Sequence, residues 1–138
     1  MSVPLDTLKY RLEKSHGFQI LVCGFMLLFV TLLDFITGYE ISFFIFYSFP
    51  IGLASWYGSR YFGILTALIC MMGWAVADYY SGHAYSHPLI PLWNGATRLI
   101  FFMFMAIAIR QMKEKYELQI RNSTVDNMTG LLNSRGFY

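Results

Sequence analysis

The chain has 138 residues, of which 57% are hydrophobic and 19% are aromatic, whereas only 13% are charged. Soluble domains carry roughly 25% charged residues, and a soluble protein of this size has too little interior to hide so much apolar surface. The net charge of +2 does not indicate a nucleic-acid partner, and the sequence holds no nucleotide- or nucleic-acid-binding signature. Composition therefore predicts an integral membrane protein whose main partner is the lipid bilayer.

A charged leader, residues 1–16, precedes the first apolar segment. Leu5, Leu8 and Leu12 recur in it at helical spacing, which is typical of an amphipathic helix. Such a helix lies along the inner membrane surface, or it continues directly into the first membrane helix. The sequence leaves both interpretations open.

Four apolar segments follow between residues 17 and 110, and each is a candidate helix across about 30 Å of hydrocarbon. The sequence thus predicts an all-α fold, an integral membrane four-helix bundle. Pro50 interrupts the second segment and predicts a kink there, because proline lacks a backbone donor. The expected spans are residues 17–38, 41–57, 61–80 and 92–109.

Lysine and arginine occupy alternate connections between these segments. Neither residue occurs in the loops 39–42 and 81–91. The positive-inside rule therefore places both termini in the cytoplasm and these two loops outside. The basic residues flanking the other segment ends are Lys9, Arg11, Lys14, Arg60, Arg110, Lys113 and Lys115.

Beyond the fourth segment, residues 111–124 are polar but still helical in pattern. Ile109, Met112, Tyr116 and Ile120 form a narrow apolar stripe at steps of three or four. A narrow stripe suits a two-stranded seam, so the pattern predicts a cytoplasmic stalk helix through which two copies form a homodimer. The alternative is a solvated helix end without a partner.

Three ionisable residues lie inside the expected spans, where an unpaired charge is costly. Asp34, Asp78 and Arg98 all fall in the outer half of the bilayer under the predicted topology. They form either a buried ion pair that fixes helix register or the polar floor of an outward-facing pocket for a small molecule. The candidate pocket residues are Asp34, Asp78, Asn94, Arg98, Tyr47, Trp74 and Trp93.

His83 and His87 lie in the second outer loop, beside these polar and aromatic residues. One interpretation is haem b with one histidine as axial ligand and aromatic side chains around the ring. A second is a divalent metal held by both imidazoles and a carboxylate. Another small ligand, or two solvated loop residues, remain as further alternatives.

The last residues, "DNMTGLLNSRGFY", resemble the entry segment of GGDEF domains, the output module of diguanylate cyclases. The matching positions are Asp126, Thr129, Gly130, Leu131, Asn133, Arg135 and Phe137. The resemblance implies that residues 125–138 begin a GGDEF domain whose GTP- and magnesium-binding loop lies beyond residue 138. It implies that this chain is not itself an enzyme, and that the whole protein is a diguanylate cyclase.

These observations predict that residues 17–110 form a sensory input domain in a bacterial inner membrane. A signal at the outer face would pass through a dimeric stalk, residues 111–124, to control cyclic di-GMP synthesis. Two alternatives stay open from the sequence. One is a purely structural membrane anchor, and the other is a small proton-coupled transporter, which also carries an acidic residue in its first span.

Overall fold

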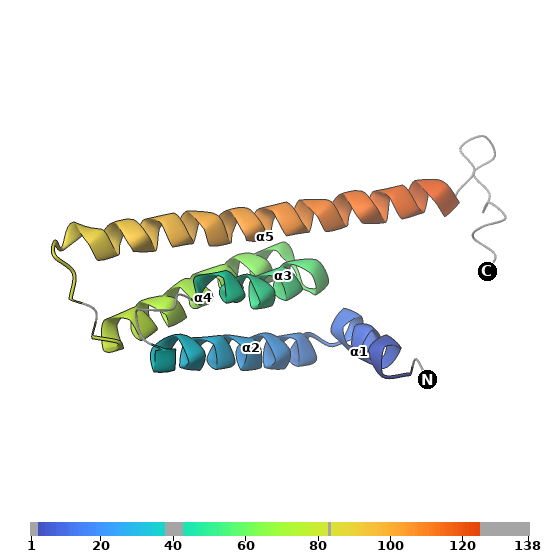
Figure 1. The fold of residues 1–138 in the computed structure, drawn as a ribbon. Helices are drawn as coiled ribbons and strands as arrows, with labels where there is room; N and C mark the ends of the chain where they lie inside the picture. The colour runs from blue at the N-terminus through green and yellow to red at the C-terminus, as the bar shows by residue number, and fades with distance from the viewer. Residues whose placement is uncertain (1–2, 38–42, 83, 125–138) are drawn as a thin grey trace.

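The computed structural model describes residues 3–37, 43–82 and 84–124. Across these ranges the regular structure is entirely helical, which confirms the predicted all-α class. The elements are α1 (Val3–Lys14), α2 (His16–Thr37), the 3-10 turn η2 (Phe44–Tyr47), α3 (Ser48–Tyr57), α4 (Arg60–Tyr80) and α5 (Leu89–Thr124) (Figure 1).

Three of these helices, α2, α4 and α5, are long and apolar enough to cross a membrane. Their lengths are 22, 21 and 36 residues, against the roughly 20 that a span requires. The chain is therefore a membrane protein. The segment 41–57 differs from the expected second span, because α3 has only 10 residues.

The expected kink at Pro50 takes another form. The chain passes from η2 directly into α3, so Pro50 lies in the first turn of the α-helix. Backbone donors in a first turn have no partner within the helix, and a proline there removes no hydrogen bond. Pro50 thus marks the start of α3 and does not bend the middle of a longer helix.

The short helix α3 lies inside the structure and contacts α2, α4 and α5. Figure 1 shows α3 and α4 lying between α2 and α5. The core surrounds this junction, where Tyr47, Ile51 and Phe102 are fully buried. A helix too short to cross the bilayer alone is therefore held by protein on several sides.

A tight connection joins α3 to α4. Ser59 caps α4, because its hydroxyl accepts a hydrogen bond of 3.1 Å from the Phe62 amide. One turn later, a Cβ atom at Gly63 would lie 3.1 Å from Ser55 Cα. Only glycine permits this approach, and small residues at helix contacts are a principal source of packing energy in membranes.

The leader forms a separate helix, α1, which ends at Lys14 before α2 begins at His16. The structure thus interrupts the helix at Ser15, between the leader and the first apolar segment. The side chain of Gln19 is buried at the junction of α1 and α2, where only 1% of the residue's surface is exposed. Its amide nitrogen donates to Leu12 O at 2.6 Å and to Tyr57 O at 2.9 Å. One buried amide thereby satisfies carbonyls near the ends of both α1 and α3, which helix geometry leaves without partners.

The beginning of α1 and the end of α5 lie at the same end of the structure (Figure 1). The connection between α4 and α5 lies at the opposite end, which we call the distal end. Arg110 adds a further link at the end near the termini, donating a hydrogen bond of 2.8 Å to Gly58 O. The predicted topology requires the beginning of α1 and the end of α5 to lie on the same side of the membrane, and the structure places them at the same end.

We expect Gly63→Ala to destabilise the fold by about 1–3 kcal/mol, because the added methyl group meets the backbone of α3. Gly24→Ala is the matched control, since no atom lies within 4 Å of a Cβ built there. Thermal unfolding of both purified variants in detergent measures the difference. Equal melting temperatures would contradict the proposed close contact between α3 and α4.

Candidate functional site

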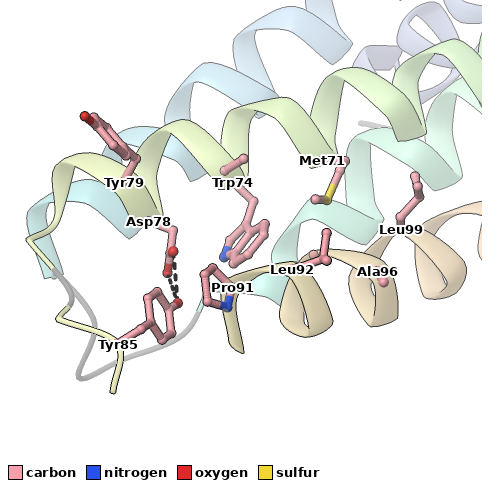
Figure 2. A pocket seen from close by; sticks show the side chains of 11 residues that line it. Met71, Trp74, Asp78, Tyr79, Tyr85, Pro91, Leu92, Ala96 and Leu99 are labelled. Atoms are coloured by element: carbon pink, nitrogen blue, oxygen red, sulfur yellow. Dashed lines mark hydrogen bonds between the residues drawn. The ribbon is translucent and has the colours of Figure 1, made fainter. Parts of the chain in front are cut away.

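A cavity of about 610 Å³ opens between α4 and α5 at the distal end. Its wall is mostly apolar, and its polar groups come from one carboxylate and the tyrosines near it (Figure 2). This size and character are those of small-molecule sites, which are concave, largely apolar and carry a few placed polar groups. The lining residues are Met71, Trp74, Ala75, Asp78, Tyr79, Tyr85, Pro91, Leu92, Gly95, Ala96 and Leu99.

The polar end of the cavity is a contact between Asp78 and Tyr85. The Tyr85 hydroxyl lies 2.7 Å from Asp78 Oδ1 and 2.9 Å from Oδ2, and donates its hydrogen to this carboxylate (Figure 2). Gly82, with a φ of 73°, supplies the left-handed turn after α4 that brings the chain back over its own end. Burial and the hydrogen bond to Asp78 raise the pKa of Tyr85 above its ordinary value, so the phenol keeps its proton and remains a donor.

Arg98 lies beside this contact but packs on aromatic rings. Its guanidinium carbon is 4.0 Å from the centre of the Trp74 ring and 5.6 Å from that of Phe44. Asp78 and Asp34 both interact electrostatically with it. A guanidinium that contacts two rings and interacts with two carboxylates is stabilised by cation–π and charge interactions together.

Asp34 is the buried anchor of the same region, with 7% of its surface exposed. Its Oδ1 accepts a hydrogen bond of 3.1 Å from the Phe43 amide, and its Oδ2 accepts one of 3.4 Å from the Tyr47 hydroxyl. These bonds attach the end of α2 to the start of η2. Asp34 therefore connects two helical elements and does not face the cavity.

The structure brings most of the predicted pocket residues to the distal end but divides them among different surroundings. Trp74 and Asp78 line the large cavity, whereas Asn94 and Arg98 line a separate hollow of about 290 Å³. Tyr47 is fully buried in the core beside Asp34. Trp93 is 70% exposed and lines neither hollow.

Sequence reasoning missed the residues that shape the cavity. Tyr85 follows Asp78 by seven positions, and only the turn at Gly82 places its hydroxyl on that carboxylate. Gly95 matters because a Cβ there would lie 2.9 Å from the end of the Met71 side chain. The available signals were Gly82, a glycine between aromatic residues, and Gly95, a glycine in an apolar helix. Many loops and membrane helices contain such glycines, so neither one indicated a cavity.

The described histidine of the distal loop has a structural role. The Nδ1 atom of His87 accepts a hydrogen bond of 3.2 Å from the Leu89 amide, and its carbonyl accepts one of 3.1 Å from Ile90. His87 thereby caps the first turn of α5, leaving Nε2 as its remaining ligand atom. His83 lies outside the described residues. Within the ranges that the structure describes, no three His, Cys, Asp or Glu side chains form a group suited to a metal ion.

The predicted dimerisation stripe turns partly inward. A Cβ built at Gly52 of α3 would lie 3.4 Å from Ile109 Cδ1, and the Tyr116 ring is centred 6.1 Å from that of Trp56. Met112 is 64% exposed and Ile120 is 45% exposed. The segment that resembles a GGDEF entry, residues 125–138, lies outside the described residues.

Comparisons with models of protein families, with curated protein sequences and with solved structures returned no match.

The haem interpretation is tested by the colour of the purified protein. If an outer-loop imidazole holds haem b, protein from haem-replete cells shows a Soret band that shifts on reduction. His87→Asn is the informative variant, because asparagine can still cap α5 but cannot replace imidazole on iron. We expect His83→Ala or His87→Asn to abolish or shift the band.

His16→Ala is the control for this measurement, since His16 lies at the start of α2, beside Gln19 and away from the distal end. Its band should equal that of the unsubstituted protein. A colourless protein that gains no band when haemin is added would contradict haem binding.

Proposed function

We propose that this chain is the transmembrane input domain of a diguanylate cyclase. The observation that carries the proposal is the course of α5, a single helix of 36 residues from Leu89 to Thr124. At 1.5 Å per residue it is roughly 54 Å long, which exceeds the hydrocarbon thickness of about 30 Å. One helix thus connects the cavity at the distal end to the segment that resembles a GGDEF entry.

Both ends of this helix are placed to take part in signalling. Near its start, Pro91, Leu92 and Gly95 line the cavity. Near its end, the helix leads into residues 125–138. A ligand changes the output only if its affinity differs between two arrangements of α5. Because α5 forms part of the cavity wall, a shift of α5 would change the contacts made by a ligand bound there.

The proposal places the termini in the cytoplasm and the distal end outside, in a bacterial inner membrane. Its support is the distribution of lysine and arginine on alternate connections. In the structure Arg60, Arg110 and Lys113 belong to the end that carries the termini, and Asp78 and Tyr85 to the distal end.

The surroundings of Asp34 speak against a proton-coupled transporter. Such a protein needs an acidic side chain near mid-membrane, whereas Asp34 lies three residues before the end of α2. Both of its oxygens accept hydrogen bonds, from the Phe43 amide and the Tyr47 hydroxyl. This carboxylate is engaged in holding two helical elements together.

A diguanylate cyclase must bring two subunits face to face, so the proposal includes a homodimer. Because Tyr116 packs toward Trp56, we assign the contact to the opposite face of α5. Ile100, Phe104 and Leu118 lie on that face and are 69%, 65% and 54% exposed. Their spacing, with Gln111 between, follows steps of four and seven residues, which keeps them along one seam.

The test joins this chain to a diguanylate cyclase domain and measures self-association and cyclic di-GMP. Leu118→Glu and Tyr116→Glu form a matched pair, because the two residues are equally exposed, at 54%, on opposite faces of α5. We expect Leu118→Glu to weaken the dimer and lower cyclic di-GMP, since it puts two like charges into the seam. Tyr116→Glu should leave the dimer intact.

Loss of the dimer with Tyr116→Glu alone would show that the dimer contact lies on the stripe that includes Met112, and not on the face of Leu118. A fusion that forms no dimer, or whose cyclic di-GMP level responds to neither variant, would contradict the proposed function.

A further inference from the structure

We propose that the cavity at the distal end binds a lipophilic amine, with its alkyl chain between α4 and α5 and its ammonium group on Asp78. The proposal rests on three features of the cavity: its apolar body, its single carboxylate and the hydroxyl that occupies this carboxylate.

The body of the cavity suits an alkyl chain. Met71, Leu92 and Leu99 face it from both helices, and Gly95 contributes no side chain (Figure 2). The volume of about 610 Å³ lies within the range of small-molecule pockets. An apolar chain that leaves lipid for this cavity gains little hydrophobic energy, so the polar end has to supply the selectivity.

The polar end favours a cation. Asp78 is half-buried, and its two oxygens point toward the cavity end that Tyr85 closes (Figure 2). Trp74 and Tyr85 add aromatic surface to the wall, and ring faces attract ammonium groups. Asp78 is the one carboxylate among the residues that line this cavity, whereas the Arg98 guanidinium lies on the Trp74 ring and lines the separate hollow. An anionic head would meet a carboxylate at the cavity end, whereas an ammonium group would complement it.

Binding has a built-in structural consequence. The Tyr85 hydroxyl lies between the two oxygens of Asp78, at 2.7 and 2.9 Å, and shares its single hydrogen with them. An ammonium group that takes this position, facing both oxygens, displaces the hydroxyl and releases the chain around Tyr85 that leads into α5. The effect of this release on the output rests on the proposed function, but the binding itself does not.

The experiment uses the purified chain in lipid nanodiscs and a dodecylamine that carries a photoreactive diazirine in its tail. Crosslinked peptides from α4 and α5 are quantified while unlabelled dodecylamine, dodecanol or dodecanoate competes. The three competitors share one tail and differ in the charge of the head. We expect dodecylamine to compete at least about tenfold better than the other two, the difference that one charge-assisted contact supplies.

Two substitutions should shift this affinity in opposite directions. Asp78→Asn keeps an acceptor for Tyr85 but removes the charge, and should weaken dodecylamine about tenfold. Tyr85→Phe removes the competing hydroxyl and keeps the ring, and should tighten it severalfold. Tyr80→Phe is the control, because Tyr80 ends α4, is 68% exposed, does not line the cavity and should leave the affinity unchanged.

Equal competition by all three compounds, tighter binding of dodecanoate, or labelling outside α4 and α5 would overturn the proposal. Weaker binding by Tyr85→Phe would also overturn it, because the hydroxyl would then help to hold the ligand. If Asp78→Asn does not fold, the headgroup series and Tyr85→Phe still decide. Labelling as expected, without a change in cyclic di-GMP in the cyclase fusion, would refute the proposed function and leave the amine site intact.

Discussion

Hydrocarbon offers no hydrogen-bond partners, and this constraint determines how the polar side chains of the chain are used. Each buried polar group in a span needs a partner from the protein itself. At the distal end the Asp34 carboxylate accepts from a backbone amide and the Tyr47 hydroxyl, and Asp78 accepts from Tyr85. At the other end Gln19 donates to two carbonyls from different helices. These few bonds fix where the helical segments meet.

The two sets of bonds explain how a helix as short as α3 holds its place. One end is attached through η2 to Asp34, and the other through Tyr57 O to Gln19, while close packing of Gly63 against Ser55 holds the middle. Helix α5 crosses both regions. It lines the cavity near Gly95, and Arg110 bonds to the end of α3 at Gly58 O. A displacement of α5 at the cavity therefore acts on a helix that is also attached to α3 through Arg110, at the other end of the structure.

Sequence reasoning predicted the helices well where apolar length alone decides. The bounds of α2 and α4 lie within one residue of the expected spans, and the membrane-protein class followed from composition. It failed where a partner distant in sequence decides. Gln19 looks like one polar residue in an apolar run, yet it bonds to a carbonyl 38 positions away. Tyr85 reaches Asp78 only through the turn at Gly82. Nothing in the spacing of Tyr116 indicated its contact with Trp56, and its place in a dimer seam stays a prediction. Periodicity predicts that a face is covered, but not which element covers it.

The proposed relay requires that α5 act as one continuous helix between the distal end and the output. Insertion of one to seven alanines after Gln119, in the chain joined to a diguanylate cyclase domain, tests it directly through cyclic di-GMP. Each added residue rotates everything beyond it by about 100°, so seven residues restore nearly the original phase. Insertion of one or two residues should change the level of cyclic di-GMP strongly, and insertion of seven should restore it. A level of cyclic di-GMP that does not depend on the number of inserted residues would show that the connection is a flexible tether and that α5 does not relay the signal as one helix.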